Sequence, residues 1–413
     1  MRERQTRRRQ GGGRIGLRSA AWLLAAAVLA PAAAAQAPAP PQTPPRGIQG
    51  DADHPVLPIG SPLPDFSLPG IDGRTHTASE YAGSRVLAVV FESNHCPVSQ
   101  LYEGRIEKLH QDYRGKGVTF VAINPNNAGS VRLDELGYTD VSDSLPEMKL
   151  RAKLRGIDWP YLYDGETQGV STKFGAVATP HIFIFDQQRK LRYQGRIDDN
   201  QREELVKSHD ARNAIDALLA GRAVPVAETK AFGCTTKWLS KSSGVEQERA
   251  RIQREPVTVE TAGAAELKAL RANATDKVTL FYFWSQGCAA CSAQFKDVEN
   301  TFRMYRKRAF NLVTVNTDPP ASGPAVLDFL KTQYASSRNV QLAGADRASL
   351  QAAWGGPWPA AAPLAMVIAP GGEVLYRKEG AIDILEVRRT ILASMPDTQS
   401  YIGSKAYWMN AIA

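Results

Sequence analysis

Two cysteines separated by two residues, Cys288 and Cys291, have the types and spacing best suited to chemistry. They follow an apolar, aromatic-rich run at residues 278–284 (VTLFYFW) and a Ser-Gln-Gly turn, and they open a segment with helical spacing. A sulfur at a helix N-terminus faces unpaired backbone N–H groups and the positive end of the helix dipole, which favours the thiolate. We therefore predict a reversible disulfide in which Cys288 attacks and Cys291, one turn later, resolves the mixed disulfide.

A structural disulfide and half of a zinc site are the alternatives for this pair. Zinc would normally require a second pair of cysteines or histidines at similar spacing, and none follows in the sequence. A copper site at Cys96 is also disfavoured, because no second cysteine lies within a turn of it. We expect no metal and no other cofactor.

A second candidate nucleophile, Cys96, lies in the Ser-Asn-His-Cys-Pro turn that ends an apolar run at residues 85–92. The neighbouring His95 would lower the pKa of this thiol if it were protonated, whereas a turn histidine that faces solvent would leave the thiol unaffected. Both interpretations of His95 stay open.

Cys234 is the fourth cysteine and lies in a polar segment, residues 226–256. Cys96 has no local partner, because Ser93 and Ser99 stand three positions before and after it. The polar segment is long enough to fold back across the first half of the chain. We predict a Cys96–Cys234 disulfide, either structural or a resolving pair; the alternative is two free thiols with Cys234 buried as a small apolar residue.

The elements that position these cysteines occur twice, in the same order. Residues 85–92 and 118–124 read as buried strands joined by a helix, which predicts a parallel crossover with Cys96 on a loop at a strand C-terminus. Pro180 precedes the strand at 182–186, and a cis bond is expected there. The second half repeats strand, cysteine turn, helix, strand and a proline, Pro363, ahead of a hairpin. The predicted fold class is α/β, with two tandem domains that each have a central mixed sheet flanked by helices.

The predicted domain organisation has six parts. They are a signal peptide at 1–36, a Pro/Ala-rich linker at 37–58, a first domain at 59–225, a connector carrying Cys234 at 226–256, a second domain at 257–396 and a C-terminal tail at 397–413.

The N-terminal segment is typical of export. An arginine-rich stretch precedes the apolar residues 20–35, which end in small residues, and a proline at position 31 leaves the apolar run at about half the ~20 residues that a bilayer span needs. The alternative is an uncleaved membrane anchor. Residues 1–36 hold seven arginines and one glutamate, so they carry +6 of the total charge of +8. The remaining +2 gives no indication of nucleic-acid binding, and we expect a periplasmic or secreted protein.

Both halves of the sequence resemble the thioredoxin superfamily. In the second half Phe283-Trp284, the CxxC turn, Pro363 and a Gly-Gly hairpin are similar to bacterial thioredoxins and cytochrome-maturation proteins. Two positions depart from that pattern. Ala289-Ala290 replaces the usual Gly-Pro between the cysteines, and Tyr282 stands where a buried acid is expected to accept a proton from Cys291.

The first half is similar to the redoxin group, relatives of alkyl hydroperoxide reductase and thiol-specific antioxidant. Ser93 replaces the first cysteine of a Cys-Asn-His-Cys-Pro motif, and Ala178-Thr179-Pro180 and Gly233-Cys234 match that group. A peroxidase that uses Cys96 is therefore an alternative activity. Val89 and Pro180 stand where peroxidases carry other residues, which disfavours it.

The resemblance implies an enzyme, a thiol-disulfide oxidoreductase that exchanges disulfides with protein thiols and draws on an upstream electron donor. Substrate grooves are expected at Thr179-Pro180, at Ala362-Pro363 and at Trp284, with backbone groups beside each proline free to pair with a substrate strand. A thioredoxin-fold module that only binds partners is the opposing interpretation, and the CxxS spacing of Cys96 and Ser99 fits it for the first domain.

Overall fold

The central strand of the first half, β3 (Val86–Phe91), lies in the middle of a five-stranded mixed sheet. The structure is a computed structural model and describes residues 53–344, 347–355 and 362–395. Parallel and antiparallel neighbours flank β3, and the sheet order is β5-β4-β3-β7-β8. The other strands are β4 (Val118–Asn124), β5 (Tyr161–Tyr163), β7 (His181–Phe185) and β8 (Leu191–Gly195).

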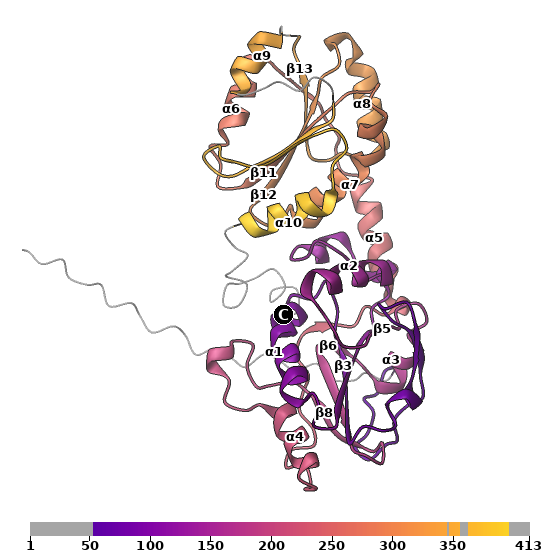
Figure 1. Ribbon diagram of the computed structural model, residues 1–413. Helices are drawn as coiled ribbons and strands as arrows, with labels where there is room; N and C mark the ends of the chain where they lie inside the picture. Colours follow the sequence, from indigo (N-terminus) through magenta and orange to yellow (C-terminus); the bar gives the residue numbers. More distant parts are fainter. Residues whose placement is uncertain (1–52, 345–346, 356–361, 396–413) are drawn as a thin grey trace, which may run out of the picture. The chain divides into compact units, whose positions relative to one another are not determined.

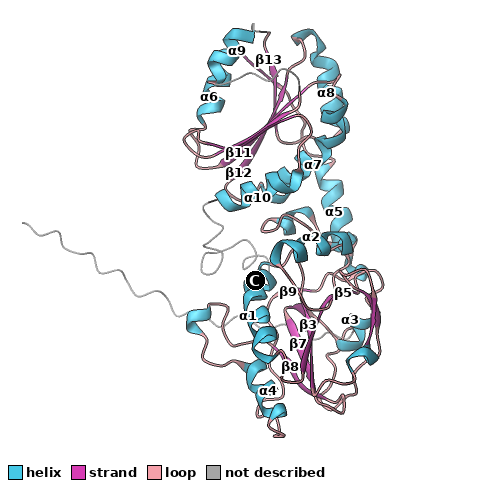
Figure 2. Cartoon of the chain, in the orientation of Figure 1, coloured by secondary structure: helices cyan, strands magenta, loops and turns pink. Residues whose placement is uncertain are grey.

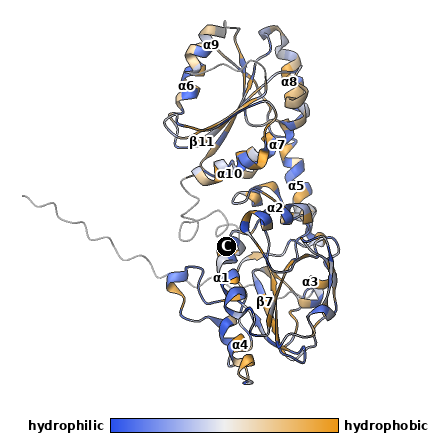
Figure 3. Ribbon diagram, viewed as in Figure 1, coloured by the Kyte–Doolittle hydropathy of each residue, from blue (hydrophilic) through white to orange (hydrophobic). Residues whose placement is uncertain are grey.

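Every residue of β3 is buried, because helices cover both faces of the sheet. Val86, Ala88 and Val90 pack toward α1, α2 and α4, and the alternate residues of the strand pack toward α3 and the N-terminal hairpin. Figure 3 shows β7 of this sheet as an apolar stretch between more polar helices. The helices are α1 (Pro97–Tyr113), α2 (Leu145–Arg155), α3 (Gly169–Phe174) and α4 (Asp210–Leu219), and the hairpin is β1 (Ser67–Pro69) and β2 (Thr75–Thr77).

The second half forms a six-stranded mixed sheet with the order β10-β13-β12-β11-β14-β15. Its central strand β11 pairs in parallel with β12 and antiparallel with β14. The strands are β10 (Glu260–Ala262), β11 (Val278–Trp284), β12 (Phe310–Asn316), β13 (Arg338–Leu342), β14 (Leu364–Ile368) and β15 (Val374–Glu379).

Helices cover both faces of this sheet as well, as Figures 1 and 2 show. Apolar residues of α6 and α9 join one core, and those of α7, α8 and α10 join the core on the opposite face. The helices are α6 (Ala264–Ala272), α7 (Ala289–Tyr305), α8 (Gly323–Thr332), α9 (Arg347–Trp354) and α10 (Ile384–Ser394).

The two sheets share the connections around their cysteine turns. In each, the central strand leads into a turn that opens a helix, the next strand is its parallel neighbour, and a cis-proline precedes the antiparallel neighbour. Both Thr179-Pro180 and Ala362-Pro363 are cis, so the predicted cis bond at Pro180 is confirmed. The predicted α/β class with mixed sheets flanked by helices is also confirmed.

Several elements of the structure were not predicted from the sequence. Strand β13 and helix α9 were not predicted, and the segment predicted to be a polar connector contains a helix, α5 (Ser243–Ile252), and a strand, β9 (Cys234–Thr235). β9 pairs with β6 (Ala178–Thr179) directly before cis-Pro180. Short 3-10 helices within the described residues are η1 (Ala78–Tyr81), η2 (Ala128–Ser130), η3 (Leu133–Leu136), η4 (Glu203–Leu205), η5 (Leu239–Lys241) and η6 (Pro320–Ser322).

The predicted signal peptide, most of the predicted linker and the predicted tail lie outside the described residues. Within the described part of the chain, none of the helices is both long and apolar enough to cross a bilayer. We call the elements around the first sheet the first domain and those around the second sheet the second domain; the predicted domain boundaries stay predictions.

Candidate functional site

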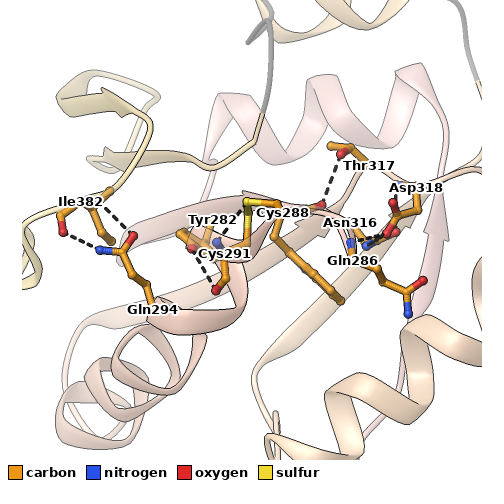
Figure 4. Close-up of a disulfide and its surroundings, with 10 residues drawn as sticks. Tyr282, Gln286, Cys288, Cys291, Gln294, Asn316, Thr317, Asp318 and Ile382 are labelled. Carbon is orange, nitrogen blue, oxygen red and sulfur yellow. Dashed lines mark hydrogen bonds between the residues drawn. A yellow bond between two sulfur atoms is a disulfide. The ribbon is translucent and has the colours of Figure 1, made fainter.

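Cys288 and Cys291 are joined in a disulfide at the junction of β11 and α7 (Figure 4). Cys288 is the N-cap residue of α7 and is half-buried, whereas Cys291 is fully buried. The backbone amide of Cys291 donates to the Cys288 sulfur at 3.0 Å. An amide donor and a helix N-terminus both stabilise negative charge on that sulfur, so the geometry favours Cys288 as the thiolate after reduction.

Asp318, just after strand β12, accepts hydrogen bonds that connect the turn carrying Cys288 to β12. The amide of Gln286 and the side-chain amide of Asn316 each donate to the Asp318 carboxylate at 2.8 Å (Figure 4). Sequence reasoning missed Asp318. Its position just after β12 was the available signal, because β12 runs parallel to β11 and both strands end at the same edge of the sheet.

One turn beyond Cys291, Gln294 attaches α7 to the loop before α10. Its side-chain amide donates to the carbonyl of Ile382 at 2.7 Å, and the Ile382 amide donates back to the Gln294 side chain at 3.1 Å (Figure 4). The helix that bears both cysteines is thereby held in place on a second side.

Tyr282 occupies the position where an acid was expected. Its hydroxyl donates to the carbonyl of Cys291 at 3.4 Å, and burial raises the pKa of the phenol. A phenol with a raised pKa stays protonated near neutral pH, so Tyr282 does not replace a carboxylate as a proton acceptor for Cys291.

Trp284 does not line a groove, contrary to the sequence prediction. Its side chain is 1% exposed and packs against Phe295 and Phe329 in the core, because it alternates with residues of β11 that face the opposite sheet surface. The other predicted groove residues of this domain, Ala362 and Pro363, directly precede β14. β14 has strand partners on both sides, and just ahead of it the amide of Gly380, which follows β15, donates to the Pro363 carbonyl at 2.8 Å.

Cys96 occupies the equivalent turn of the first domain, as the N-cap residue of α1. Its side chain is fully buried, its thiol donates to the carbonyl of Thr179 at 3.2 Å, and the amide of Ser99 donates to its sulfur at 3.4 Å. Ser93, which replaces the first cysteine of the related motif, lies nearby, with its hydroxyl 3.0 Å from that of Thr179.

Cys234 lies beside Cys96, because β9 pairs with β6 and aligns Cys234 with Thr179. Both are buried free thiols, so the predicted neighbourhood is correct but the predicted disulfide is not formed in this structure. Burial works to raise the pKa of Cys96, but the hydrogen bond from Cys234, the charge of His95 and the Ser99 amide together lower it to about 6. Burial and the Cys96 charge raise the pKa of Cys234.

His95 is fully buried, so the interpretation that it faces solvent is wrong. Its Nδ1 makes a short contact with the Asp143 carboxylate, which also accepts hydrogen bonds from the amides of Asn94 and His95 and from the side chain of Asn126. Burial works to lower the pKa of His95, but the Asp143 charge and hydrogen bond raise it. A protonated His95 next to Cys96 favours the thiolate.

Asp143 is the functional residue that sequence reasoning missed in this domain. It lies in a polar segment between β4 and β5 that resembles a surface insertion, and its pairing with His95 spans 48 residues of sequence. No local pattern marks it, because an acid in a polar loop is ordinarily solvated.

Among the described residues, no cluster of three or more histidines, cysteines, aspartates or glutamates is arranged to hold a metal ion. The two sites present one disulfide and one pair of neighbouring thiols, with Cys288 and Cys96 each at the start of a helix.

Residues 59–194 match the protein-family model described as the AhpC/TSA family. The buried cysteine turn, the cis-proline and the β5-β4-β3-β7-β8 sheet of this domain agree with the match. The first domain belongs to the thioredoxin superfamily. The resemblance of the first domain to this superfamily, predicted from the sequence, is thereby confirmed. The thioredoxin-like character of the second domain stays a prediction, which its strand order supports.

Individual relatives of the chain were also found. A thiol-disulfide oxidoreductase, ResA, from Geobacillus thermodenitrificans is 24% identical over 151 residues, which are 37% of this chain and 75% of the relative. A hypothetical protein from Sinorhizobium meliloti 1021 is 33% identical, with 45% of this chain and 98% of that chain covered and a TM-score of 0.40. An uncharacterised conserved protein from Geobacillus kaustophilus is 34% identical, with 47% and 96% covered and a TM-score of 0.40. The family match and the curated relative support a redox enzyme of the thioredoxin-superfamily kind.

Proposed function

We propose that this protein is an exported thiol-disulfide oxidoreductase that exchanges disulfides with protein thiols through Cys288 and Cys291. The observation that carries the proposal is the difference in exposure between the two cysteines of the disulfide. Cys288 is half-buried at the helix N-cap, and Cys291 is fully buried one turn later. An incoming sulfur is therefore expected to reach Cys288 first.

In the reducing direction, the Cys288 thiolate attacks one sulfur of a substrate disulfide. A bond forms between Cys288 and that sulfur, the substrate S–S bond breaks, and the leaving thiolate takes a proton. Cys291, as a thiolate, then attacks the Cys288 sulfur, which restores the Cys288–Cys291 disulfide and releases the second substrate thiol. Two electrons pass from the protein to the substrate; run backward, the same steps oxidise a substrate dithiol.

Two features of the second domain support this chemistry. The Cys291 amide, 3.0 Å from the Cys288 sulfur, is a donor that stabilises the attacking or leaving thiolate. The backbone ahead of cis-Pro363 precedes a strand that already has partners on both sides, so a substrate strand is expected to pair there, before β14 begins.

The test is reduction of insulin by the full chain with a dithiol donor present. Cys288→Ser is expected to lower the rate to background, because it removes the attacking sulfur. Cys96→Ser and Cys234→Ser are the matched controls and are expected to retain the rate. An unchanged rate in Cys288→Ser would overturn the proposal.

A second candidate function, thiol peroxidase, is favoured by the position of Cys96 at a helix N-cap, where the Ser99 amide donates to its sulfur at 3.4 Å and the pKa of the thiol is lowered to about 6. The thiolate would attack a peroxide oxygen to give a sulfenic acid and release water or an alcohol, and the Cys234 thiol would condense with the sulfenic acid to give a disulfide and water. Complete burial of Cys96 speaks against rapid peroxide chemistry. A binding role without catalysis is the remaining alternative for the first domain.

The periplasmic or secreted location is part of this proposal. It is supported by the arginine-rich and apolar N-terminal sequence. Protease accessibility and signal-peptide cleavage of the full chain in intact cells would test it, with an intracellular, uncleaved product as the contradicting result.

A further inference from the structure

We propose that the chain's own residues 231–238 act as an internal competitor at the surface beside Thr179 and cis-Pro180, where the family resemblance places an extended, cysteine-containing substrate strand. The proposal concerns the first domain and does not depend on the activity of Cys288 and Cys291. It corrects one sequence expectation, because the backbone ahead of Pro180 was expected to be free.

The occupying segment pairs with the cis-proline loop as a strand. Cys234 is aligned with Thr179, Thr235 is aligned with Ala178, and the ladder continues as the amide of Thr236 donates to the carbonyl of Val177 at 3.1 Å. The backbone groups that a partner strand would use are thus already satisfied by the chain itself.

Gly233 allows this close approach. A Cβ atom at this position would lie 2.0 Å from the carbonyl oxygen and 2.7 Å from the carbonyl carbon of Thr179. Both are backbone atoms next to a cis-proline, so they cannot move aside as the end of a flexible side chain could. The segment therefore requires glycine directly before its cysteine.

Side chains fix the segment at both ends. Phe232 is buried in the first-domain core and contacts Tyr102, and Trp238 stacks on His54 with a ring separation of 3.7 Å. Between them, the amide of Lys237 donates to the side chain of Asn126 at 2.8 Å, and the carbonyl of Lys237 accepts from the Asn127 amide at 3.1 Å. This surface therefore accommodates an extended strand that has an aromatic residue near each end and a Gly-Cys pair between them.

The chemistry of the site follows from where this strand places its cysteine. Cys234 is aligned with Thr179, whose carbonyl accepts from the Cys96 thiol at 3.2 Å, so Cys234 lies in the place that a partner cysteine would take. If a partner strand replaced residues 231–238 and brought a disulfide, the Cys96 thiolate would attack one of its sulfurs. A Cys96–partner bond would form, the partner's S–S bond would break, and the leaving sulfur would take a proton. While the internal strand is seated, Cys96 is closed to such partners.

The test measures access to Cys96 in the full chain with Cys288 and Cys291 both replaced by serine, so that its outcome is separate from that of the proposed function. Gly233→Ala is expected to displace the strand and to raise the alkylation rate of Cys96, followed by mass spectrometry, by about tenfold or more. Gly244→Ala is the matched control, because a Cβ at Gly244 meets nothing within 4 Å.

The peptide AFGCTTKW, residues 231–238, provides a second readout when its cysteine is activated as a mixed disulfide with thionitrobenzoate. Gly233→Ala is expected to form a Cys96–peptide disulfide and release thionitrobenzoate, whereas the parent and Gly244→Ala chains are expected to react much more slowly. Equal alkylation and equal peptide capture in a folded Gly233→Ala chain would overturn the proposal.

A milder variant keeps the test decisive if Gly233→Ala does not fold. The Thr236 hydroxyl donates to the Ala176 carbonyl, so Thr236→Val loosens the strand while keeping the shape of the side chain. It is expected to raise both readouts less than Gly233→Ala would. No change in either readout for Thr236→Val would then overturn the proposal.

Discussion

The Asp143 carboxylate accepts a hydrogen bond from the backbone amide of His95 at 3.2 Å and also contacts its imidazole Nδ1, with both side chains fully buried. His95 directly precedes Cys96. A residue from the polar segment between β4 and β5 thus sets the charge next to a buried thiol, and Asp143 acts as a positioning residue for the first-domain site.

Asp143→Asn is predicted to raise the pKa of Cys96 above its value of about 6. Without the carboxylate, burial lowers the pKa of His95 and the imidazole loses its proton, so the thiolate loses a neighbouring positive charge. Ultraviolet absorbance of the thiolate against pH, in the chain with Cys288 and Cys291 replaced by serine, measures the change. The exposed Asp328→Asn is the control and is expected to leave the titration in place. An unshifted titration in Asp143→Asn would refute the assignment.

The same ion pair predicts a pH window of stability. The pKa of His95 is raised above 6.5, so its contribution is complete below pH 6.5 and is lost as the pH rises through the raised pKa. The pKa of Asp143 is lowered below 3.8, so its contribution is complete above pH 3.8 and is lost as the pH falls.

Asp143→Asn should therefore lower the free energy of unfolding most between pH 3.8 and 6.5, by about 3–5 kcal/mol for a broken buried pair. Urea unfolding of both chains across this range measures the difference. If the difference in the free energy of unfolding between the two chains grew steadily above pH 8, the predicted pH dependence would be wrong.

Cys96 is predicted to react with hydrogen peroxide only slowly, at a rate near that of an ordinary thiol. Cys96 is fully buried, and the sequence resemblance places Val89 and Pro180 at positions where peroxidases carry other residues. Stopped-flow measurement of the reduced chain provides the rate, with Cys96→Ser as the blank. A fast reaction that disappears in the blank would make peroxidase the leading function.

Cys291→Ser is predicted to trap a mixed disulfide between Cys288 and a protein substrate, because the resolving sulfur is absent. Non-reducing electrophoresis with a disulfide-containing substrate should show a covalent adduct that dithiothreitol removes. The Cys288→Ser/Cys291→Ser chain is the control. An adduct of equal amount in that control would assign the trapping to another cysteine.

Tyr282→Phe is predicted to keep the insulin-reduction rate and its pH profile within about twofold. The phenol has a raised pKa and makes only a 3.4 Å contact with the Cys291 carbonyl, so it supplies no proton acceptor for Cys291. Steady-state rates across pH check this. A large loss of rate with a displaced pH profile would show that the hydroxyl takes part in proton transfer.

The sequence by itself determined the elements next to both cysteine turns. Apolar strands at 86–91 and 278–284, the helix-opening cysteines and the prolines ahead of β7 and β14 are local signals, because burial of a strand and the start of a helix depend on neighbouring residue types. The position of Cys234 near Cys96 also followed from counting the cysteines and from the expectation of an oxidising compartment.

Tertiary structure alone decided what surrounds those cysteines. Asp143 reaches His95 across 48 residues, and Gly233 lies against Thr179 only because β9 returns to β6. Pairing over such distances leaves no periodic pattern in the chain. Trp284 shows the same limit: the family resemblance placed it in a groove, but alternation along a strand covered on both faces puts its side chain in the core.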